Sequence, residues 1–144
     1  MGRNRAKVTG RAESGYYFQI PEYVLNSEQF RELSYMAKAL LLDIGAQFRG
    51  RNNGDLNATY STMQKRNWKS KDSLAKTLRE LLDARLLIKT RQGGRNQCSL
   101  YALGWRGIDD CGGKLDLALT TKVPLFAPIK NQSPTPATVP TRPT

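Results

Sequence analysis

Two stretches of the chain carry apolar residues at the alternating three- and four-residue spacing of an amphipathic helix. The first predicts a helix over residues 35–48 with Ser34 as its N-cap, and the second a helix over residues 71–84 with Ser70 as its N-cap. The positions that face the core are Leu33, Ala37, Leu40, Leu41, Ile44, Phe48, Leu74, Leu78, Leu81 and Leu82. We therefore expect two helices that pack on a common core.

A shorter helix is predicted between these two, over residues 60–66, with Thr59 as its cap. Asn67 suits the positive φ of a tight turn, and Trp68 can fill the angle between this helix and the next one. The loop RGRNNGD over residues 49–55 precedes it. Its asparagines and glycine suit turns, so it is either a plain connector or, through its two arginines, a contact for phosphate.

The second long helix is followed by a pattern typical of a β-hairpin. Residues 86–90 and 98–103 are strand-like, and Gly93 and Gly94 between them allow a sharp reversal. Residues 56–58 could add a short strand, and Trp105 is expected to close the core. The long helix before the hairpin is expected to end near Ala84, with Arg85 as the position after it. The predicted fold class is therefore mainly α with a small antiparallel β-hairpin (α+β), with three core helices and a wing.

Composition changes at both ends of this pattern, which predicts a domain over residues 16–110. Residues 1–15 form a basic arm, either a disordered leader or an arm that orders on DNA, and residues 111–144 form a Pro- and Thr-rich tail with disorder from about residue 130. Pro21 predicts an extended segment over residues 16–25, and Asn26 or Ser27 can cap a helical turn after it. The apolar tail residues either dock on the domain or bind a partner: Val123, Leu125, Phe126 and Ile129.

Charge narrows the range of partners. The 144 residues include 23 Lys and Arg against 12 Asp and Glu, a net charge of +11. Such an excess favours nucleic acid, and secondarily an anionic membrane. A membrane-spanning helix is not expected because no apolar run approaches the ~20 residues it requires. Because the basic N-terminus has no apolar stretch behind it, we expect a cytoplasmic, nucleoid-associated protein.

The residue types argue against catalysis. Histidine is absent, which excludes His-based acid–base chemistry and Cys/His zinc sites, and the two cysteines, Cys98 and Cys111, are expected to be inert thiols. The chain has no phosphate-binding GxxxxGK[ST] motif and no close carboxylate cluster. We expect no enzymatic activity and no cofactor.

The basic residues concentrate where the helix–turn–helix and hairpin are predicted, with ten basic and three acidic residues over residues 61–95. Lysine and arginine can donate to guanine or phosphate, and Asp can accept from cytosine. Ser70 and Asp72 also have local explanations, as a cap and as a favourable charge for the helix dipole. The candidate DNA contacts are Lys69, Ser70, Lys71, Asp72, Ser73, Lys76, Thr77 and Arg79 on the second long helix, with Arg91, Gln92, Arg95 and Asn96 on the hairpin.

The run MQKRNWKSKDSLAKTLRELLDARLLIKTRQGGRNQCSLYAL resembles the winged helix-turn-helix superfamily, in particular its small bacterial, plasmid and phage members that act in regulation or replication initiation. The resemblance covers about residues 18–105. It implies double-stranded DNA as partner, with the recognition helix in the major groove and the basic wing on phosphates or the minor groove. One departure is Arg85, where such domains often have Gly at positive φ. Either the helix ends differently, or Arg85 accepts a strain of roughly 1 kcal/mol.

The resemblance leaves a second function open. Some members of the fold are protein-interaction modules, so the chain could be an adaptor that uses the domain as a scaffold and the C-terminal tail as the partner-binding segment. Homodimer formation also stays open, although no heptad repeat indicates a dimerisation helix. The two functions differ in their dependence on salt, because binding to DNA weakens steeply as salt rises.

Overall fold

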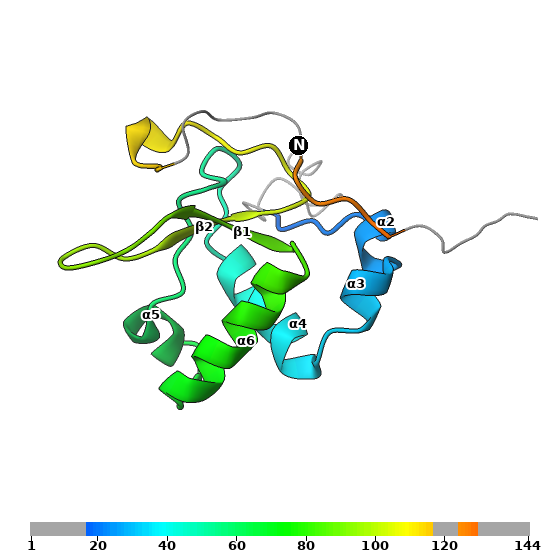
Figure 1. The fold of residues 1–144 in the computed structure, drawn as a ribbon, viewed down its shortest axis with the longest axis horizontal. Helices are drawn as coiled ribbons and strands as arrows, with labels where there is room; N and C mark the ends of the chain where they lie inside the picture. The colour runs from blue at the N-terminus through cyan, green and yellow to red at the C-terminus, as the bar shows by residue number, and fades with distance from the viewer. Residues whose placement is uncertain (1–16, 117–123, 130–144) are drawn as a thin grey trace, which may run out of the picture.

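The computed structural model describes residues 17–116 and 124–129 (Figure 1). Helices α2 (Glu22–Leu25), α3 (Glu28–Arg31), α4 (Tyr35–Gly45), α5 (Tyr60–Gln64) and α6 (Lys71–Asp83) come first along the chain. Strands β1 (Leu87–Arg91) and β2 (Leu100–Leu103) follow as an antiparallel hairpin, and a 3-10 turn occupies Cys111–Gly113. The fold is therefore α+β, as expected.

The predicted N-caps are present. The Oγ atoms of Ser27, Ser34 and Ser70 accept from the backbone N–H of Phe30, Ala37 and Ser73 at 3.1–3.2 Å, and Thr59 Oγ1 accepts from Thr62 at 3.2 Å. Each bond satisfies an N–H that would otherwise lack a partner in the first helical turn. Helix α4 ends at Gly45 rather than near residue 48, because the chain tightens there: the backbone N–H of Phe48 donates to Gly45 at 2.9 Å.

The expectation of an extended segment over residues 16–25 is wrong for its second half. Residues Glu22–Leu25 form α2, with Pro21 at the N-cap position and its carbonyl accepting from Val24 at 3.0 Å. Proline is excluded from a helix interior, but it is tolerated at a helix start because it has no N–H to leave unsatisfied there. Pro21 therefore begins a helical turn.

Helix α6 ends in a Schellman motif with a non-glycine residue at its turning point. Arg85 has φ 63°. Its N–H donates to the Leu82 carbonyl at 3.0 Å, and the Leu86 N–H reaches back to Leu81 at 3.1 Å. Leu86 is fully buried, so the core places the chain in this reversal. Of the two alternatives, Arg85 accepts the strain.

The two strands pair with Leu87 opposite Leu103 and Lys89 opposite Tyr101, followed by a bulge before Arg91. Leu56 forms a single bridge to Tyr101, with backbone N···O distances of 2.7 and 3.2 Å, in place of the short strand considered over residues 56–58. The reversal predicted at Gly93–Gly94 lies further along. The Gly94 N–H donates to Gln97 at 2.9 Å, so Arg95 and Asn96 form the tip.

One apolar core joins these elements. Its fully buried members include Val24 of α2, Leu40, Leu41 and Ile44 of α4, Met63 of α5, Leu81 of α6, and Leu87 and Leu103 of the hairpin. Trp105 is buried as predicted and lies 6.1 Å from the Phe18 ring, centroid to centroid. The Phe18 ring fills the space that a side chain at Gly45 would need. The N-terminal segment is thereby packed against α4.

Packing continues past residue 110, the predicted domain boundary. Asp116 donates its backbone N–H to Thr90 at 2.8 Å, and the buried Phe126 donates its own to Gly104 at 2.8 Å. Gln29 holds the same segment, donating to the Ala127 carbonyl at 2.8 Å and accepting from the Ile129 N–H at 3.1 Å. The segment over residues 124–129 is therefore docked on the domain, which was one of the two alternatives for the apolar tail residues. Val123, the arm over residues 1–15 and the tail beyond residue 130 lie outside the described residues.

Candidate nucleic-acid interface

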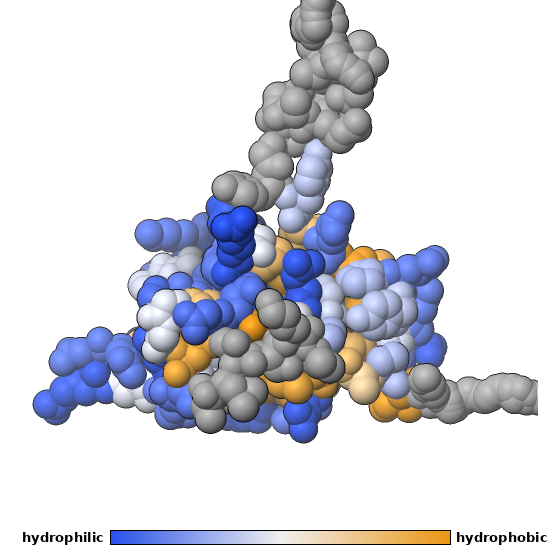
Figure 2. All heavy atoms as spheres, turned by 90° about the horizontal axis from the view of Figure 1, so that it is seen from above, coloured by the Kyte–Doolittle hydropathy of each residue, from blue (hydrophilic) through white to orange (hydrophobic). Residues whose placement is uncertain are grey.

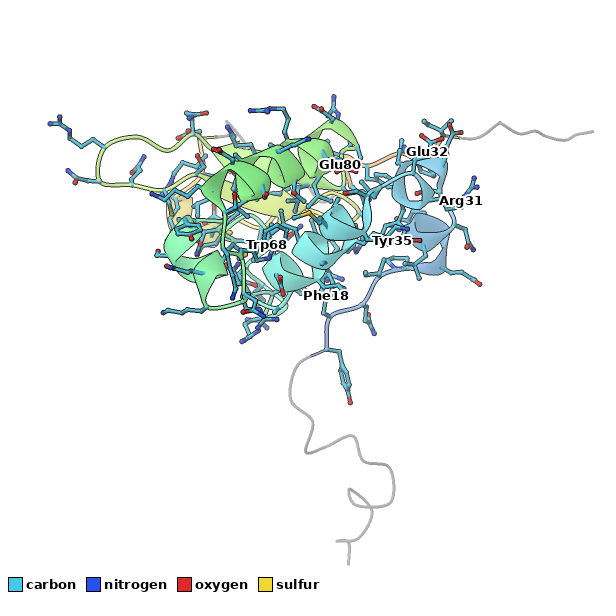
Figure 3. All side chains as sticks on the ribbon, turned by 90° about the horizontal axis from the view of Figure 1, so that it is seen from below. Phe18, Arg31, Glu32, Tyr35, Trp68 and Glu80 are labelled. Atoms are coloured by element: carbon cyan, nitrogen blue, oxygen red, sulfur yellow. The ribbon has the colours of Figure 1, made fainter. Side chains whose placement is uncertain are left out.

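The turn between α5 and α6 is fixed by a carboxylate of α4. Asn67 has φ 76°, as predicted, and Trp68 is 8% exposed. The Trp68 indole donates to Asp43 Oδ2 at 2.8 Å, and the Arg66 guanidinium contacts Oδ1 at 3.1 Å. The backbone N–H of Trp68 also donates to Met63 at 3.1 Å. These bonds tie the start of α6 to α4, so α6 has a defined orientation on the body (Figure 3).

Helix α6 has one apolar and one basic side. Leu74 and Leu81 are buried and Leu78 is half-buried against the core, as the apolar spacing predicted. The opposite side is exposed to solvent and carries Lys71, Asp72, Ala75, Lys76 and Arg79, with Lys69 and Ser70 exposed immediately before the helix. The structure thus brings most of the predicted helix contacts together on one open surface, which we call the α6 outer face.

The cations of the α6 outer face form no ion pair with neighbouring acids within the described residues. Within the described ranges, the ion pairs are Arg66–Asp43 and Lys114–Asp55, neither of which includes a residue of this face. Lys71 Nζ lies 5.4 Å from the centroid of the Tyr60 ring, and the Tyr60 hydroxyl donates to the Lys69 carbonyl at 2.9 Å. Tyr60 therefore positions the chain at the start of α6 without cancelling its charge.

Three predicted contacts have structural roles instead. Thr77 is 5% exposed, and its hydroxyl donates to the Ser73 carbonyl at 2.6 Å. Thr77 lies on the inner side of α6, between Leu74 and Leu81. The prediction that Thr77 contacts DNA is not kept, because its side chain faces the core. Ser70 Oγ is engaged as the N-cap. Ser73 is half-buried. Its backbone N–H donates to Ser70 Oγ, and its carbonyl accepts from the Thr77 hydroxyl.

The hairpin residues divide in the same way. Arg91 is half-buried, and its guanidinium donates to the Cys98 carbonyl at 2.8 and 3.2 Å, which braces the two strands. Gln92 accepts from Lys89 Nζ at 3.1 Å through its side chain. Arg95 and Asn96 are exposed at the tip, with Asn96 at φ 64°. The tip extends well beyond the helical body in Figure 1, and Figure 2 shows it as mostly hydrophilic.

The beginning of α6 and the hairpin tip lie at the same end of the molecule (Figure 1). At the opposite end, α3 and the last turn of α6 carry Glu28, Glu32, Glu80 and Asp83 around a hollow of about 250 Å³. Glu80 accepts from the Ser34 N–H and hydroxyl at 2.7 and 2.8 Å, so part of this acidic surface holds the start of α4. The acidic residues around this hollow therefore lie away from the basic residues at the start of α6 and at the hairpin tip.

The loop over residues 49–55 contains a structural residue that the sequence reasoning missed. Asn53 is fully buried, and its side chain accepts from the Leu103 N–H at 2.7 Å and donates to the Gly107 carbonyl at 2.9 Å. It is not at positive φ, which occurs at Gly50 and Gly54. A turn-like composition gave no signal of this long-range role. The loop is a connector tied to β2, and Arg51 in it is exposed.

The thiols and carboxylates give no indication of a metal site. Both cysteines are free. Burial, reinforced by the carboxylates of Asp55 and Asp109, raises the pKa of Cys111 to about 11, so this thiol stays protonated at neutral pH. Among residues 17–116 and 124–129, no three His, Cys, Asp or Glu side chains are grouped to hold a metal ion. In the same ranges, no helix has both the length and the apolar composition to cross a bilayer.

No protein family, curated protein or solved structure matches this chain. The interpretation of the α6 outer face and the hairpin tip therefore depends on their own geometry and charge.

Proposed function

We propose that the chain is a winged helix-turn-helix protein that binds double-stranded DNA, in transcription regulation or in plasmid or phage replication control. Support comes first from the order of the elements. Helix α4, the Leu56–Tyr101 bridge, the α5–turn–α6 unit and the β1–β2 hairpin follow one another as in a winged helix. In this arrangement α6 is the recognition helix and the hairpin tip is the wing.

The observation that carries the proposal is the exposed basic surface of α6 and the hairpin tip, whose cations form no ion pair within the described residues. Lys71 and Lys76 lie on the exposed side of α6, whose other side is packed in the core, and the exposed Lys69 lies just before the helix. A helix of this kind fits the major groove, which admits its side chains to base edges. Arg95 on the tip is then placed to reach the next stretch of phosphates or the minor groove.

The candidate contacts fall into two groups: some side chains are exposed, and others form hydrogen bonds that hold the start of α6 or the hairpin. Lys71, Asp72, Lys76 and Arg79 are exposed and are proposed to face the bases and nearby phosphates. Arg95 and Asn96, with Gln92 behind them, are proposed to contact the backbone sequence-independently. Ser70, Ser73 and Arg91 shape the helix start and the hairpin, so they are proposed to act by positioning the others.

The test begins with selection of bound sequences from a random duplex pool, followed by fluorescence anisotropy on the enriched site and on a scrambled one. Lys71→Ala and Lys76→Ala should each weaken binding to the enriched site most, by about tenfold or more. Arg95→Ala should weaken binding to both duplexes about alike. Arg31→Ala removes one exposed positive charge from α3, away from the start of α6 and from the tip, and serves as the control.

One result would contradict the DNA-binding proposal. If the triple variant Lys71→Ala/Lys76→Ala/Arg95→Ala binds both duplexes as tightly as the Arg31→Ala control, the surface does not bind DNA. The adaptor function would then be the better proposal. It is favoured by Leu125 and Ile129, which remain 44% and 53% exposed beside the buried Phe126. Capture of a protein partner that persists at high salt and is lost in Leu125→Ser/Ile129→Ser would support it.

A further inference from the structure

Helix α4 is apolar on the side that faces away from the core. Tyr35, Met36 and Leu42 are 86%, 48% and 52% exposed, and Ala39 and Ala46 on the same side are exposed as well. The inner side of the helix is buried at Ala37, Leu40, Leu41 and Ile44. A helix with apolar residues all round is ordinarily covered on both sides. The outer side of α4 has no such cover among the described residues.

The spacing of these residues indicates what kind of surface would cover them. Tyr35, Ala39, Leu42 and Ala46 follow one another at intervals of four, three and four residues. This is the spacing by which one helix presents a straight seam to another helix. We call these four positions the α4 seam. A groove of about 460 Å³ lies beside it, lined by Met36, Ala39 and Asp43 of α4, by Trp68, and by Lys69, Ser70 and Ser73 at the start of α6.

We propose that the partner on the α4 seam is the α4 seam of a second copy, in an antiparallel pair. With the two-fold axis between residues 40 and 41, Tyr35 lies opposite the partner's Ala46, and Leu42 lies opposite the partner's Ala39. Each large side chain meets a small one, and the two-fold axis repeats every contact. A surface that fits itself in this way is what an isologous dimer requires.

Charge is compatible with this pairing. The four seam residues are uncharged, and Asp43 at the edge is already compensated by Arg66. Antiparallel pairing places each flank of α4 beside the same flank of the partner, so Lys38 lies near the partner's Lys38. The carbonyl end of the partner's α4, which carries partial negative charge, offsets part of that repulsion. The Lys38 ammonium lies over the rings of Tyr35 and Phe30, with Nζ 5.3 and 5.4 Å from their centroids. The whole chains repel one another, since each carries +11.

The size of the seam sets the strength of the dimer. The eleven residues of α4 span roughly 16 Å, which is short for the ~800 Å² per partner of a standard interface. Free chains should therefore associate weakly, and more strongly at high salt, where their mutual repulsion is screened. Two chains on neighbouring DNA sites would be held at high local concentration, which favours the same contact. The pairing itself does not require DNA.

Analytical ultracentrifugation of the full chain without DNA tests the dimer. Tyr35→Glu/Leu42→Glu should raise the dimer dissociation constant about tenfold or more, since it places four carboxylates on the paired seams. Tyr23→Glu/Leu25→Glu makes the same exchanges at exposed residues of α2, which are 49% and 40% exposed, and should leave the constant unchanged. A wild-type chain that stays monomeric at millimolar concentration in both low and high salt, or equal effects of the two double variants, would overturn the proposal.

Disulfide trapping tests the orientation. In a Cys98→Ser/Cys111→Ser background, Ala39→Cys and Leu42→Cys chains are mixed and oxidised. Antiparallel pairing predicts that the mixed 39–42 disulfide dominates over either like-with-like product. Predominance of the 39–39 and 42–42 products would indicate parallel helices and contradict the register. Because DNA is absent from both experiments, they can succeed or fail independently of the DNA-binding proposal.

Discussion

The outer sides of α4 and α6 are both open to solvent, but their chemistry is opposite. The α6 outer face carries Lys71, Lys76 and Arg79, whereas the α4 seam carries Tyr35 and Leu42 with alanines between them. The inner sides of the two helices are alike, since each contributes leucines to one core. The contrast shows that packing in the core accounts for the inner half of each helix and leaves the chemistry of the exposed half without an explanation from the core.

Asp43 connects the two outer sides. It lies on α4 at the edge of the groove beside the seam, and it holds the Trp68 indole and Arg66 of the turn that begins α6. These hydrogen bonds therefore attach the basic start of α6 to α4, the helix whose outer side is apolar. We expect changes at Asp43 to lower both the stability of the fold and the proposed DNA binding. Changes on the α6 outer face should affect DNA binding alone, and changes on the α4 seam should affect self-association alone.

The largest expected effect separates the inner from the outer side of α6. Leu81→Ala should lower the free energy of unfolding by about 3 kcal/mol, because it leaves a cavity in the core. Lys76→Ala, five residues earlier on the exposed side, should change it by less than about 0.5 kcal/mol. Urea denaturation measures both. If the two variants lost equal stability, the division of α6 into a packed and a free side would be wrong.

Asp43→Ala is expected to lower the free energy of unfolding by about 2 kcal/mol, because the nearly buried Trp68 N–H loses its acceptor. Asp72→Ala, which removes an exposed carboxylate from the first turn of α6, should lower it by less than about 1 kcal/mol. The measurement is again urea denaturation, with near-UV circular dichroism reporting on the indole. An unperturbed Trp68 signal in Asp43→Ala would show that Asp43 does not hold the turn.

Arg85→Gly should raise the free energy of unfolding by about 1 kcal/mol, since Gly adopts the positive φ of the α6 terminus without strain. Arg79→Gly removes the same charge from the helix interior and should lower it by about 1 kcal/mol. Thermal denaturation of the two variants compares them directly. A loss of stability in Arg85→Gly would mean that the Arg85 side chain contributes more than its backbone conformation takes away.

The smallest expected effect is the response of self-association to salt, and duplex binding should respond to salt in the opposite direction. Raising salt from 0.15 to 0.5 M should strengthen self-association through the α4 seam by a few-fold, as repulsion between the two positively charged chains is screened. The same change should weaken duplex binding through the α6 outer face. Sedimentation and anisotropy on one sample measure the two. Responses of the same sign would show that both processes use one surface.

The sequence was most informative where a local rule decides the structure. The serine and threonine caps, the positive φ of Asn67 and the inner side of α6 followed from side-chain chemistry and helical spacing. Local rules could not place Asn53, whose hydrogen bonds reach Leu103 and Gly107, because those partners are distant in sequence. They also misplaced the hairpin reversal, where pairing of Gly94 with Gln97 moves the tip to Arg95 and Asn96.

The candidate site shows the same limit. Composition located the basic region, and the exposed side of α6 followed from its apolar spacing. Thr77 was misjudged because one residue at the edge of a helical stripe can turn either way, and packing against the core decides. The α4 seam was missed because the buried stripe of the same helix accounted for its apolar residues. The exposure of Tyr35 and Leu42 became visible only with the fold.

The salt dependence of duplex affinity tests the central claim most directly, with the wild-type chain and the Lys71→Ala/Lys76→Ala/Arg95→Ala variant measured side by side between 50 and 200 mM. If α6 and the hairpin tip contact roughly six to ten phosphates, wild-type affinity should fall by a factor on the order of 10³ to 10⁵, and the variant should show a clearly shallower slope. A wild-type affinity that does not change with salt, or a variant with an identical slope, would contradict the assignment of this surface to DNA.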